Sequence, residues 1–310
     1  MILFKSSSVL PRPLRRFEIL DAPSILGLRP TGVEYLPEAI KAAGLLNRLD
    51  AEYAGQVSAP EYSSKRDEET LLLNPEAIRN YSKQLANAVA RVLERKRFPI
   101  VLGGDCSIIV GNVLALRRLG RYGLFFIDGH ADFYQPEASP TGEVADMDLA
   151  IVSGRGPDVL ASIDDLKPLV QDEDIVLFGN RDAEQARSYG SQDVDQTGIH
   201  VFDFEKVQEI GFRTATSQAI GKLMKSELDG FWIHLDVDVL NDRDMPAVDY
   251  RLAGGFDFEE LSQLLRVLLG SGKAVGMDIT IFNPKLDLDG SIAHRLVSSL
   301  VAGLSSPKDK

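Results

Sequence analysis

Short apolar segments alternate along this chain with longer segments of helical periodicity, and this alternation constrains the fold more than any other feature. Four segments repeat apolar residues with the spacing of a helix, at 74–97, 107–120, 214–228 and 256–270. Six segments rich in Val, Ile, Leu and Phe predict buried strands, at 98–103, 122–128, 174–180, 198–203, 230–236 and 274–280. Strands that are apolar on both faces and separated by helices form a parallel sheet covered on both sides. The sequence therefore predicts an α/β fold whose ligand site lies at the carboxyl ends of the strands.

Size, charge and cysteine content narrow the class of protein. The 310 residues suit one large α/β domain, and no linker or internal repeat divides them, so we predict a single domain over 1–310. A net charge of −12 without a long basic stretch argues against nucleic acid or an acidic membrane as a partner. No apolar run reaches the roughly 20 residues that cross a bilayer. A single cysteine excludes an internal disulfide and fits a reducing compartment, so we expect a cytoplasmic protein.

Three of the predicted strands end in polar clusters. The first is followed by "GGDCS" (103–107), which contains Cys106, the only cysteine of the chain. The second ends in "DGHAD" (128–132), and the third ends in "HLDVDVLND" (234–242). Because alternate residues of an extended strand point to the same side, the acids and the histidine within each cluster are expected to converge.

The acids of these clusters need a cation. A buried carboxylate is costly unless it is paired or bound to a metal, and neither 128–132 nor 234–242 contains Lys or Arg. One such motif alone is often only a turn after a strand, but two of them on separate strands, with a third polar turn nearby, favour a metal site. A carboxylate-rich donor set with imidazole suits Mn²⁺ or a similar divalent ion, and carboxylates can bridge two ions.

The motifs also resemble those of a known family. The chain is identified as a member of the ureohydrolase superfamily of arginases, agmatinases, guanidinobutyrases and formimidoylglutamases, whose signatures are "GGDHS", "DAHxD" and "DxDxxDP" in this order. Segments 29–46, 178–185 and 277–284 resemble further family segments, so the resemblance covers nearly the whole chain. It implies a three-layer α/β/α fold on a mostly parallel sheet of about eight strands. It also implies a metal-dependent hydrolase of linear C–N bonds in a small-molecule substrate, and a homo-oligomer.

The resemblance assigns roles to individual positions. It implies two divalent metal ions, Mn²⁺ in most members, with a shared water as the nucleophile. The metal ligands would be Cys106, Asp128, His130, Asp132, Asp236 and Asp238. Asp132 or a nearby acid, Glu143 or Asp146, would accept the proton of the water. The positions expected to contact the substrate are Glu184, Ile281 and Asn283.

Three positions depart from the family pattern. Cys106 replaces a metal-binding histidine, Ile281 replaces the glutamate that holds a guanidinium group, and Ala145 replaces a proton-shuttling histidine. A thiolate is a softer ligand than imidazole and would favour Zn²⁺, Fe²⁺, Ni²⁺ or Co²⁺, although a cysteine here can also be a small buried packing residue. The Nω-hydroxy-L-arginine amidinohydrolases, which the chain resembles locally, also have cysteine in this position. An apolar residue at 281 suits a neutral or less basic group than guanidinium.

Two alternatives to a binuclear hydrolase stay open at this stage. One is a deacetylase-like amidohydrolase with a single metal, and the other is a catalytically reduced homologue that binds a ligand. His234 could donate to a carboxylate of the site, but we interpret it as a satisfied strand residue.

Overall fold

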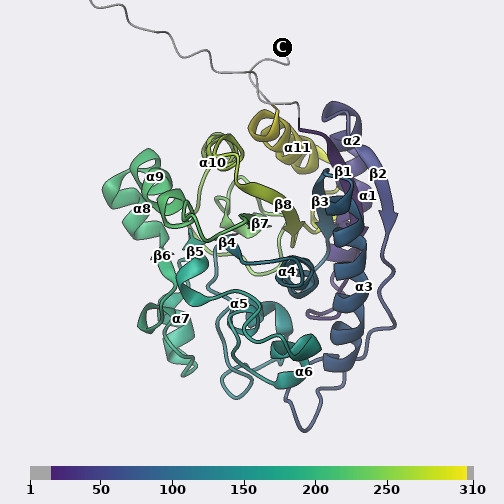
Figure 1. Ribbon diagram of the computed structural model, residues 1–310, viewed down its shortest axis with the longest axis vertical. Helices are drawn as coiled ribbons and strands as arrows, with labels where there is room; N and C mark the ends of the chain where they lie inside the picture. Colours follow the sequence, from purple (N-terminus) through teal and green to yellow (C-terminus); the bar gives the residue numbers. More distant parts are fainter. Residues whose placement is uncertain (1–14, 306–310) are drawn as a thin grey trace, which may run out of the picture.

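Eight parallel strands form the central sheet of the computed structural model, which describes residues 15–305 (Figure 1). The order across the sheet is β2-β1-β3-β8-β7-β4-β5-β6, and every neighbouring pair is parallel. The strands are β1 (Phe17–Ala22), β2 (Glu52–Gln56), β3 (Phe98–Gly103), β4 (Tyr122–Ile127), β5 (Ile175–Phe178), β6 (His200–Phe202), β7 (Gly230–Asp236) and β8 (Ala274–Thr280). The predicted α/β fold and all six predicted strands are confirmed.

Sequence patterns missed β1 and β2. β1 is fully buried but contains two acids, Glu18 and Asp21, which interrupt its apolar run. Both acids are neutralised by distant residues, because Arg95 pairs with Glu18 and Lys41 pairs with Asp21. β2 lies at the edge of the sheet and is largely exposed, so it carries no apolar pattern.

Helices cover both faces of the sheet and complete the three layers (Figure 1). One face packs against α3 (Pro75–Glu94), α4 (Ile109–Arg117), α5 (Asp148–Val152) and α6 (Asp158–Ala161). The other face packs against α1 (Leu36–Ala42), α2 (Leu45–Arg48), α8 (Phe204–Ile210), α9 (Phe212–Lys222), α10 (Phe258–Gly270) and α11 (Ser291–Leu304). A further short helix, α7 (Ala183–Ser188), follows β5. No helix within residues 15–305 has both the length and the apolarity needed to cross a bilayer.

One helix prediction needs correction, and several helices were missed. The helix predicted over 214–228 is α9, which ends at Lys222. Leu223 and Leu228 are buried beyond this end, so the apolar spacing continues although the helix does not. α11 was not predicted at all. The beginning of α10 follows the expectation, because the Asp257 carboxylate accepts from the Glu260 N–H and the Glu260 carboxylate accepts from the Asp257 N–H.

The strand order brings the three polar motifs together. β3 and β4 are consecutive along the chain, but they are not neighbours in the sheet. β8 and β7 lie between them. The carboxyl ends of β3, β8, β7 and β4 are therefore neighbours at the centre of the sheet. The polar residues that follow β3 and β4 meet those at the end of β7 at this edge, as the rule for parallel sheets requires.

The register between β4, β7 and β8 places a polar stripe under α4. His234 is the register partner of Phe126 on one side and of Asp278 on the other. The buried Asp278 carboxylate accepts from Asn112 Nδ2 of α4 at 3.0 Å, from Trp232 Nε1 and from the His234 ring. Three donors thus compensate for the burial of one carboxylate in the core.

Close backbone packing fixes the turn after β3. The Asp105 N–H donates to the Ser24 carbonyl at 3.0 Å, and the Gly104 carbonyl accepts from the Ile281 N–H at 2.8 Å. A Cβ atom at Gly104 would lie 1.8 Å from the Ser24 carbonyl oxygen. Only glycine fits at this position, and its packing determines where Cys106 lies.

Replacing Gly104 with alanine is expected to destabilise the protein, because the new methyl group forces the β1 and β3 loops apart. We predict a loss of about 3 kcal/mol or more in the free energy of unfolding, measured by urea titration. Gly221→Ala in α9 is the control, since a Cβ atom there meets nothing within 4 Å. That variant should be neutral or more stable by up to about 1 kcal/mol. Equal stability of the two variants would contradict the proposed packing.

Candidate metal centre

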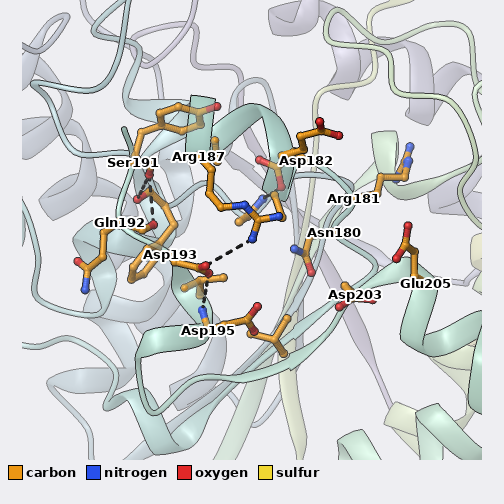
Figure 2. Close-up of a pocket in the computed structure, with 18 residues that line it drawn as sticks. Asn180, Arg181, Asp182, Arg187, Ser191, Gln192, Asp193, Asp195, Asp203 and Glu205 are labelled. Atoms are coloured by element: carbon orange, nitrogen blue, oxygen red, sulfur yellow. Dashed lines mark hydrogen bonds and ion pairs between the residues drawn. The ribbon is translucent and has the colours of Figure 1, made fainter. Parts of the chain in front are cut away.

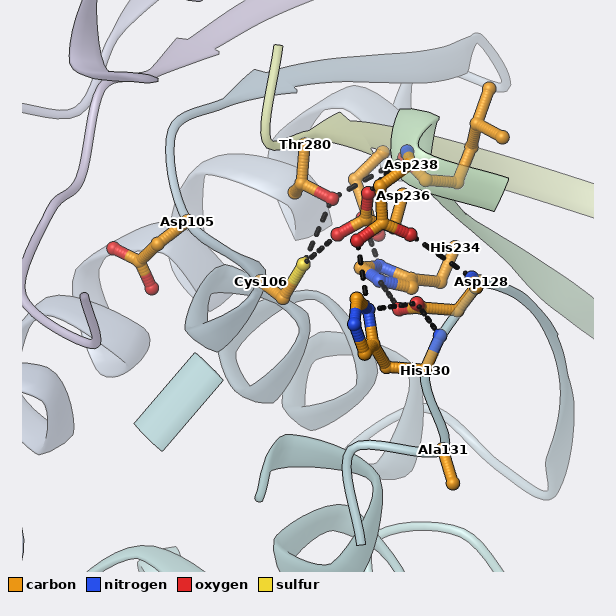
Figure 3. A network of polar contacts seen from close by, with 12 residues as sticks. Asp105, Cys106, Asp128, His130, Ala131, His234, Asp236, Asp238 and Thr280 are labelled. Atoms are coloured by element: carbon orange, nitrogen blue, oxygen red, sulfur yellow. Dashed lines mark hydrogen bonds and ion pairs between the residues drawn. The ribbon is translucent and has the colours of Figure 1, made fainter. Parts of the chain in front are cut away.

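Cys106 lies at one side of the polar cluster and points its thiol towards Asp236 and Thr280 (Figure 3). It begins a single helical turn after β3, is fully buried, and its thiol lies 2.9 Å from Asp236 Oδ2 and 3.1 Å from Thr280 Oγ1. Figure 3 shows Asp105 pointing away from the cluster, where its carboxylate accepts from Ser24 Oγ at 2.9 Å and from the Ser107 N–H at 2.9 Å. Asp105 therefore holds the turn, and Cys106 faces the other acids.

A second group of donors surrounds His130. Its Nδ1 lies 2.9 Å from Asp238 Oδ2 and 3.8 Å from Asp128 Oδ1. Backbone N–H groups fix both acids, because His130 donates to Asp128 at 2.7 Å and Gly129 donates to Asp238 at 3.0 Å. The turn after β4 and the end of β7 thus converge as the motif spacing predicted.

Asp132 has a strained backbone. Its φ of 45° lies in the left-handed region, and the side chain is buried. A donor atom of Asp132 lies within 4.8 Å of donor atoms of both Cys106 and Asp148. The left-handed turn directs this carboxylate back towards the cluster, which a simple extended strand would not do.

Asp148 was missed by sequence reasoning. It is the first residue of α5, its side chain is fully buried, and neither carboxylate oxygen has a hydrogen-bond partner among the described residues. The segment "MDLA" offers no motif around this acid, so only the packing of α5 against the sheet reveals it. A buried carboxylate without a partner requires either a proton or a cation.

Burial and mutual repulsion dominate the electrostatics of the cluster. Burial raises the pKa of Asp128, Asp132, Asp148 and Asp236 well above the usual range for a carboxyl group, and neighbouring carboxylates raise each pKa further. Burial likewise raises the pKa of the Cys106 thiol, and the Asp236 carboxylate adds to this shift. A bound metal ion would act in the opposite direction and lower these pKa values, because it favours the deprotonated groups.

The pair of His130 and Asp238 behaves differently. Burial alone lowers the pKa of the His130 imidazole, but the Asp238 carboxylate outweighs this effect and raises the pKa to about 10. Burial raises the pKa of Asp238, yet His130 and Arg181 together bring it below the usual value. Arg181 Nη2 donates to the Asp238 carbonyl at 2.8 Å, so a cation from the loop after β5 lies beside the cluster.

The two other predicted proton acceptors lie in the loop between β4 and α5. Both carboxylate oxygens of Glu143 are engaged, one by Arg29 Nε and the other by the Tyr250 hydroxyl, each at 2.7 Å. Asp146 accepts from Ser139 Oγ at 3.0 Å through one oxygen, and its other oxygen has no partner among residues 15–305. Burial raises the pKa of Asp146 to about 7. Ala145 is buried next to these two acids.

The predicted substrate-contacting residues occupy different environments. Ile281 directly follows Thr280 at the end of β8, is buried, and has a φ of 70°, which is rare for a β-branched residue. The Asn283 side chain donates to Asp249 Oδ1 at 2.8 Å and accepts from the Lys285 N–H at 3.1 Å. Glu184 is exposed on α7 and lines a cavity. Contact of these residues with a substrate stays a prediction.

This cavity of about 420 Å³ lies beside the metal-ligand cluster (Figure 2). Three residues that line the cavity, Ala131, Arg181 and Asp182, also lie next to the cluster. Ala131 follows His130 and donates its N–H to the Asp182 carboxylate at 3.0 Å, and Arg181 contacts the Asp238 carbonyl. Six acids and two arginines line it: Asp182, Glu184, Asp193, Asp195, Asp203, Glu205, Arg181 and Arg187.

The donor atoms fit divalent metal ions. The cluster contains three groups of donor atoms, and within each group the atoms lie within 4.8 Å of one another. The groups are Cys106 with Asp128 and His234, Cys106 with Asp132 and Asp148, and Asp128 with His130 and Asp238. Asp128 Oδ2, His234 Nε2 and both oxygens of Asp148 are buried without a hydrogen-bond partner in the described part of the chain. Buried carboxylate and imidazole atoms without partners, close to a thiol group, are what a metal site requires.

Comparisons with known proteins identify the family of this chain. The model of the arginase family matches residues 16–305. An arginase of Staphylococcus aureus (strain COL) is 32% identical over 292 residues, covering 92% of this chain and 95% of that protein. The crystal structure of the Bacillus caldovelox arginase superimposes with a TM-score of 0.83 at 27% identity, covering 94% and 99% of the two chains. The proclavaminate amidinohydrolase of Streptomyces clavuligerus shares the fold, with a TM-score of 0.67 at 19% identity and coverage of 94% and 90%.

The chain therefore belongs to the arginase family, within the ureohydrolase superfamily. It is a ureohydrolase-type enzyme that acts on C–N bonds other than peptide bonds.

Removing divalent ions is expected to destabilise the protein most at alkaline pH. The acids of the cluster have raised pKa values when folded, so the metal-free folded state binds more protons than the unfolded state and loses stability as pH rises. Bound ions replace those protons. Chelation should lower the melting temperature by about 5–15 °C at pH 8 and by less at pH 5.5. Scanning calorimetry with and without chelator measures this difference.

Adding Mn²⁺ or Zn²⁺ back after chelation is the control, and it should restore the melting temperature. Metal analysis of the untreated protein shows how many ions it holds. Purified protein without metal, whose melting temperature at pH 8 is unchanged by chelator, would contradict a metal centre.

Proposed function

We propose that the protein is a metal-dependent hydrolase that cleaves a guanidino-, amidine- or formimino-type C–N bond with two divalent ions. The convergence of buried donor groups at the ends of β3, β4 and β7, with unpartnered atoms on Asp128, Asp148 and His234, carries this proposal. When bound, such ions lower the pKa of water and supply a nucleophile at neutral pH. Donor atoms of Asp128 lie close to both Cys106 and His130, and Asp236 Oδ2 contacts Cys106. Asp128 and Asp236 would be shared by the two ions. His130 and Asp238 would hold one ion, and Cys106 and Asp132 the other.

The chemical type of the donor atoms indicates which metal ion each half of the cluster would prefer. His130 with three carboxylates provides a site that suits Mn²⁺. The Cys106 thiol makes the other half softer, which favours Zn²⁺, Fe²⁺, Ni²⁺ or Co²⁺ there. Metal analysis distinguishes this binuclear centre from a single-metal amidohydrolase, since the first predicts two ions per chain and the second predicts one.

Asp146 is the better candidate of the two loop acids for accepting a proton. Both oxygens of Glu143 are used by Arg29 and Tyr250, so Glu143 holds three loops together. Asp146 keeps one unpartnered oxygen and lies next to Ala145, where related enzymes place a proton-shuttling histidine. Asp132 would then serve mainly as a metal ligand.

Substrate recognition would combine an acidic cavity with an apolar contact. The excess of acids around the cavity, including Glu184, favours a substrate with a cationic end such as an ammonium group. Arginine, which the names of the relatives suggest, has such an end. Ile281 provides no carboxylate for a guanidinium group, so the reacting group would be neutral or less basic, as in a hydroxyguanidine, amide or formimino compound. We further propose a cytoplasmic homo-oligomer, on the basis of the family resemblance and the single cysteine.

A substrate panel tests the proposed function. Guanidino, hydroxyguanidino, formimino and simple amide compounds are incubated with the metal-loaded protein, and released urea, ammonia, formamide or acid is measured. Activity on at least one C–N substrate is expected, and Asp238→Asn should lower it at least about 100-fold by weakening metal binding. Asp257→Asn is the matched control, because asparagine caps a helix as well as aspartate does. No turnover across the panel by fully metal-loaded protein would favour a ligand-binding homologue instead.

Replacing Ile281 with glutamate should shift the preference towards cationic guanidinium compounds. The new carboxylate would pair with the guanidinium group, and we expect kcat/KM for such compounds to rise about tenfold relative to neutral ones. Ile281→Leu tests for a pure packing effect and should leave the ratio unchanged. An unchanged ratio in Ile281→Glu would show that position 281 does not contact the reacting group.

A further inference from the structure

We propose that His234 is a ligand of the metal ion on the Cys106 side, and that it supplies the imidazole that position 106 lacks. This inference rests on the metal binding in the proposed function but not on its substrate. It replaces the interpretation of His234 as a satisfied strand residue, because one of its ring nitrogens is buried without any partner among residues 15–305.

The position of His234 follows from the strand register. His234 lies two residues before Asp236 on β7, so the two side chains leave the same face of the sheet. Its neighbours across the sheet are Phe126 and Asp278. The Phe126 ring stacks on the imidazole with a centroid distance of 4.3 Å and an angle of 24°. The ring is therefore held in one plane, within the same stripe of the sheet that ends in the metal cluster.

The Asp278 carboxylate sets the direction of the ring. Asp278 Oδ2 contacts His234 Nδ1, and Asp278 Oδ1 accepts from Trp232 Nε1 and Asn112 Nδ2. A carboxylate held by these donors accepts the proton on Nδ1, which leaves the lone pair on Nε2. Metal-binding histidines are commonly oriented by a carboxylate in this way.

His234 Nε2 points to the metal cluster (Figure 3). It lies 3.9 Å from Asp128 Oδ2, too far for a hydrogen bond, and Asp128 Oδ2 has no partner in the described chain either. The donor atoms of His234, Asp128 and Cys106 all lie within 4.8 Å of one another. Two ligands at about 2.0–2.3 Å from one ion lie at most about 4.6 Å apart. An ion between these three atoms would thus satisfy two buried groups that otherwise have no partner.

Charge supports the same assignment. A thiolate at position 106 adds a negative charge to a cluster that already contains several buried carboxylates, whereas a neutral imidazole adds a donor without adding charge. Sulfur, nitrogen and oxygen donors together favour Zn²⁺ or Co²⁺ over Mn²⁺. In this arrangement His234 of β7 supplies the imidazole that the family pattern places in the turn after β3. The ion therefore keeps an imidazole ligand although position 106 is a cysteine.

Replacement of His234 with glutamine tests the proposal on the Co²⁺-loaded protein. The absorption band of a thiolate bound to Co²⁺ reports the ion at Cys106, and metal analysis reports the number of ions. We expect His234→Gln to weaken Co²⁺ binding at the thiolate at least about tenfold, while the ion at His130 and Asp238 stays bound. His200→Gln is the matched control, because His200 is a partly exposed residue of β6 outside the cluster. It should bind Co²⁺ like the wild-type protein.

A second measurement covers the case in which His234→Gln does not fold. Pulsed electron paramagnetic resonance on His130→Gln loaded with one equivalent of Cu²⁺ detects nitrogen coupling from any remaining imidazole ligand. Coupling to one imidazole is expected, since His234 is then the histidine left in the cluster. Absence of that coupling, or a thiolate–Co²⁺ band of unchanged affinity in His234→Gln, would overturn the proposal. In both cases metal binding by the wild-type protein would leave the proposed function intact, and its absence would remove both.

Discussion

Repulsion among buried carboxylates is the constraint on which the rest of this structure depends. Asp128, Asp132, Asp148 and Asp236 are withdrawn from water at one edge of the sheet, where burial raises the pKa of each and neighbouring carboxylates raise it further. A fold keeps such a cluster only if protons or cations compensate for it. Helices on both faces of the parallel sheet keep the surrounding strands away from water.

The support around the cluster is as specific as the cluster itself. Asp278 is buried in the same stripe, yet three donors satisfy it and it orients His234. Gly104 allows the loops after β1 and β3 to touch, which positions Cys106 against Asp236. Left-handed backbone at Asp132 and Ile281 adds local strain on both sides of the site, a cost that functional sites commonly carry.

The departures from the family pattern form a connected set. Donor atoms of Cys106 and His234 lie in one group of the cluster, so an imidazole lies close to the position where the family pattern has a histidine. Ala145 lies beside Asp146, an acid with a pKa of about 7, and Ile281 lies beside Thr280, which contacts Cys106. The chain keeps the acids and the histidine of the motifs at 128–132 and 236–238, while positions 106, 145 and 281 differ from the family pattern.

The sequence by itself determined the class of fold, six of the strands and the acids and histidine of the metal motifs. These are local properties, because apolar periodicity and residue type are readable over a few positions. It did not show β1, where distant basic residues neutralise two acids, nor α11, nor the end of α9. Only the tertiary structure decided that Asp148 faces Cys106 and that Asp278 orients His234. The second contact depends on the pairing of β7 with β8 in the middle of the sheet, and no short-range pattern encodes that strand order.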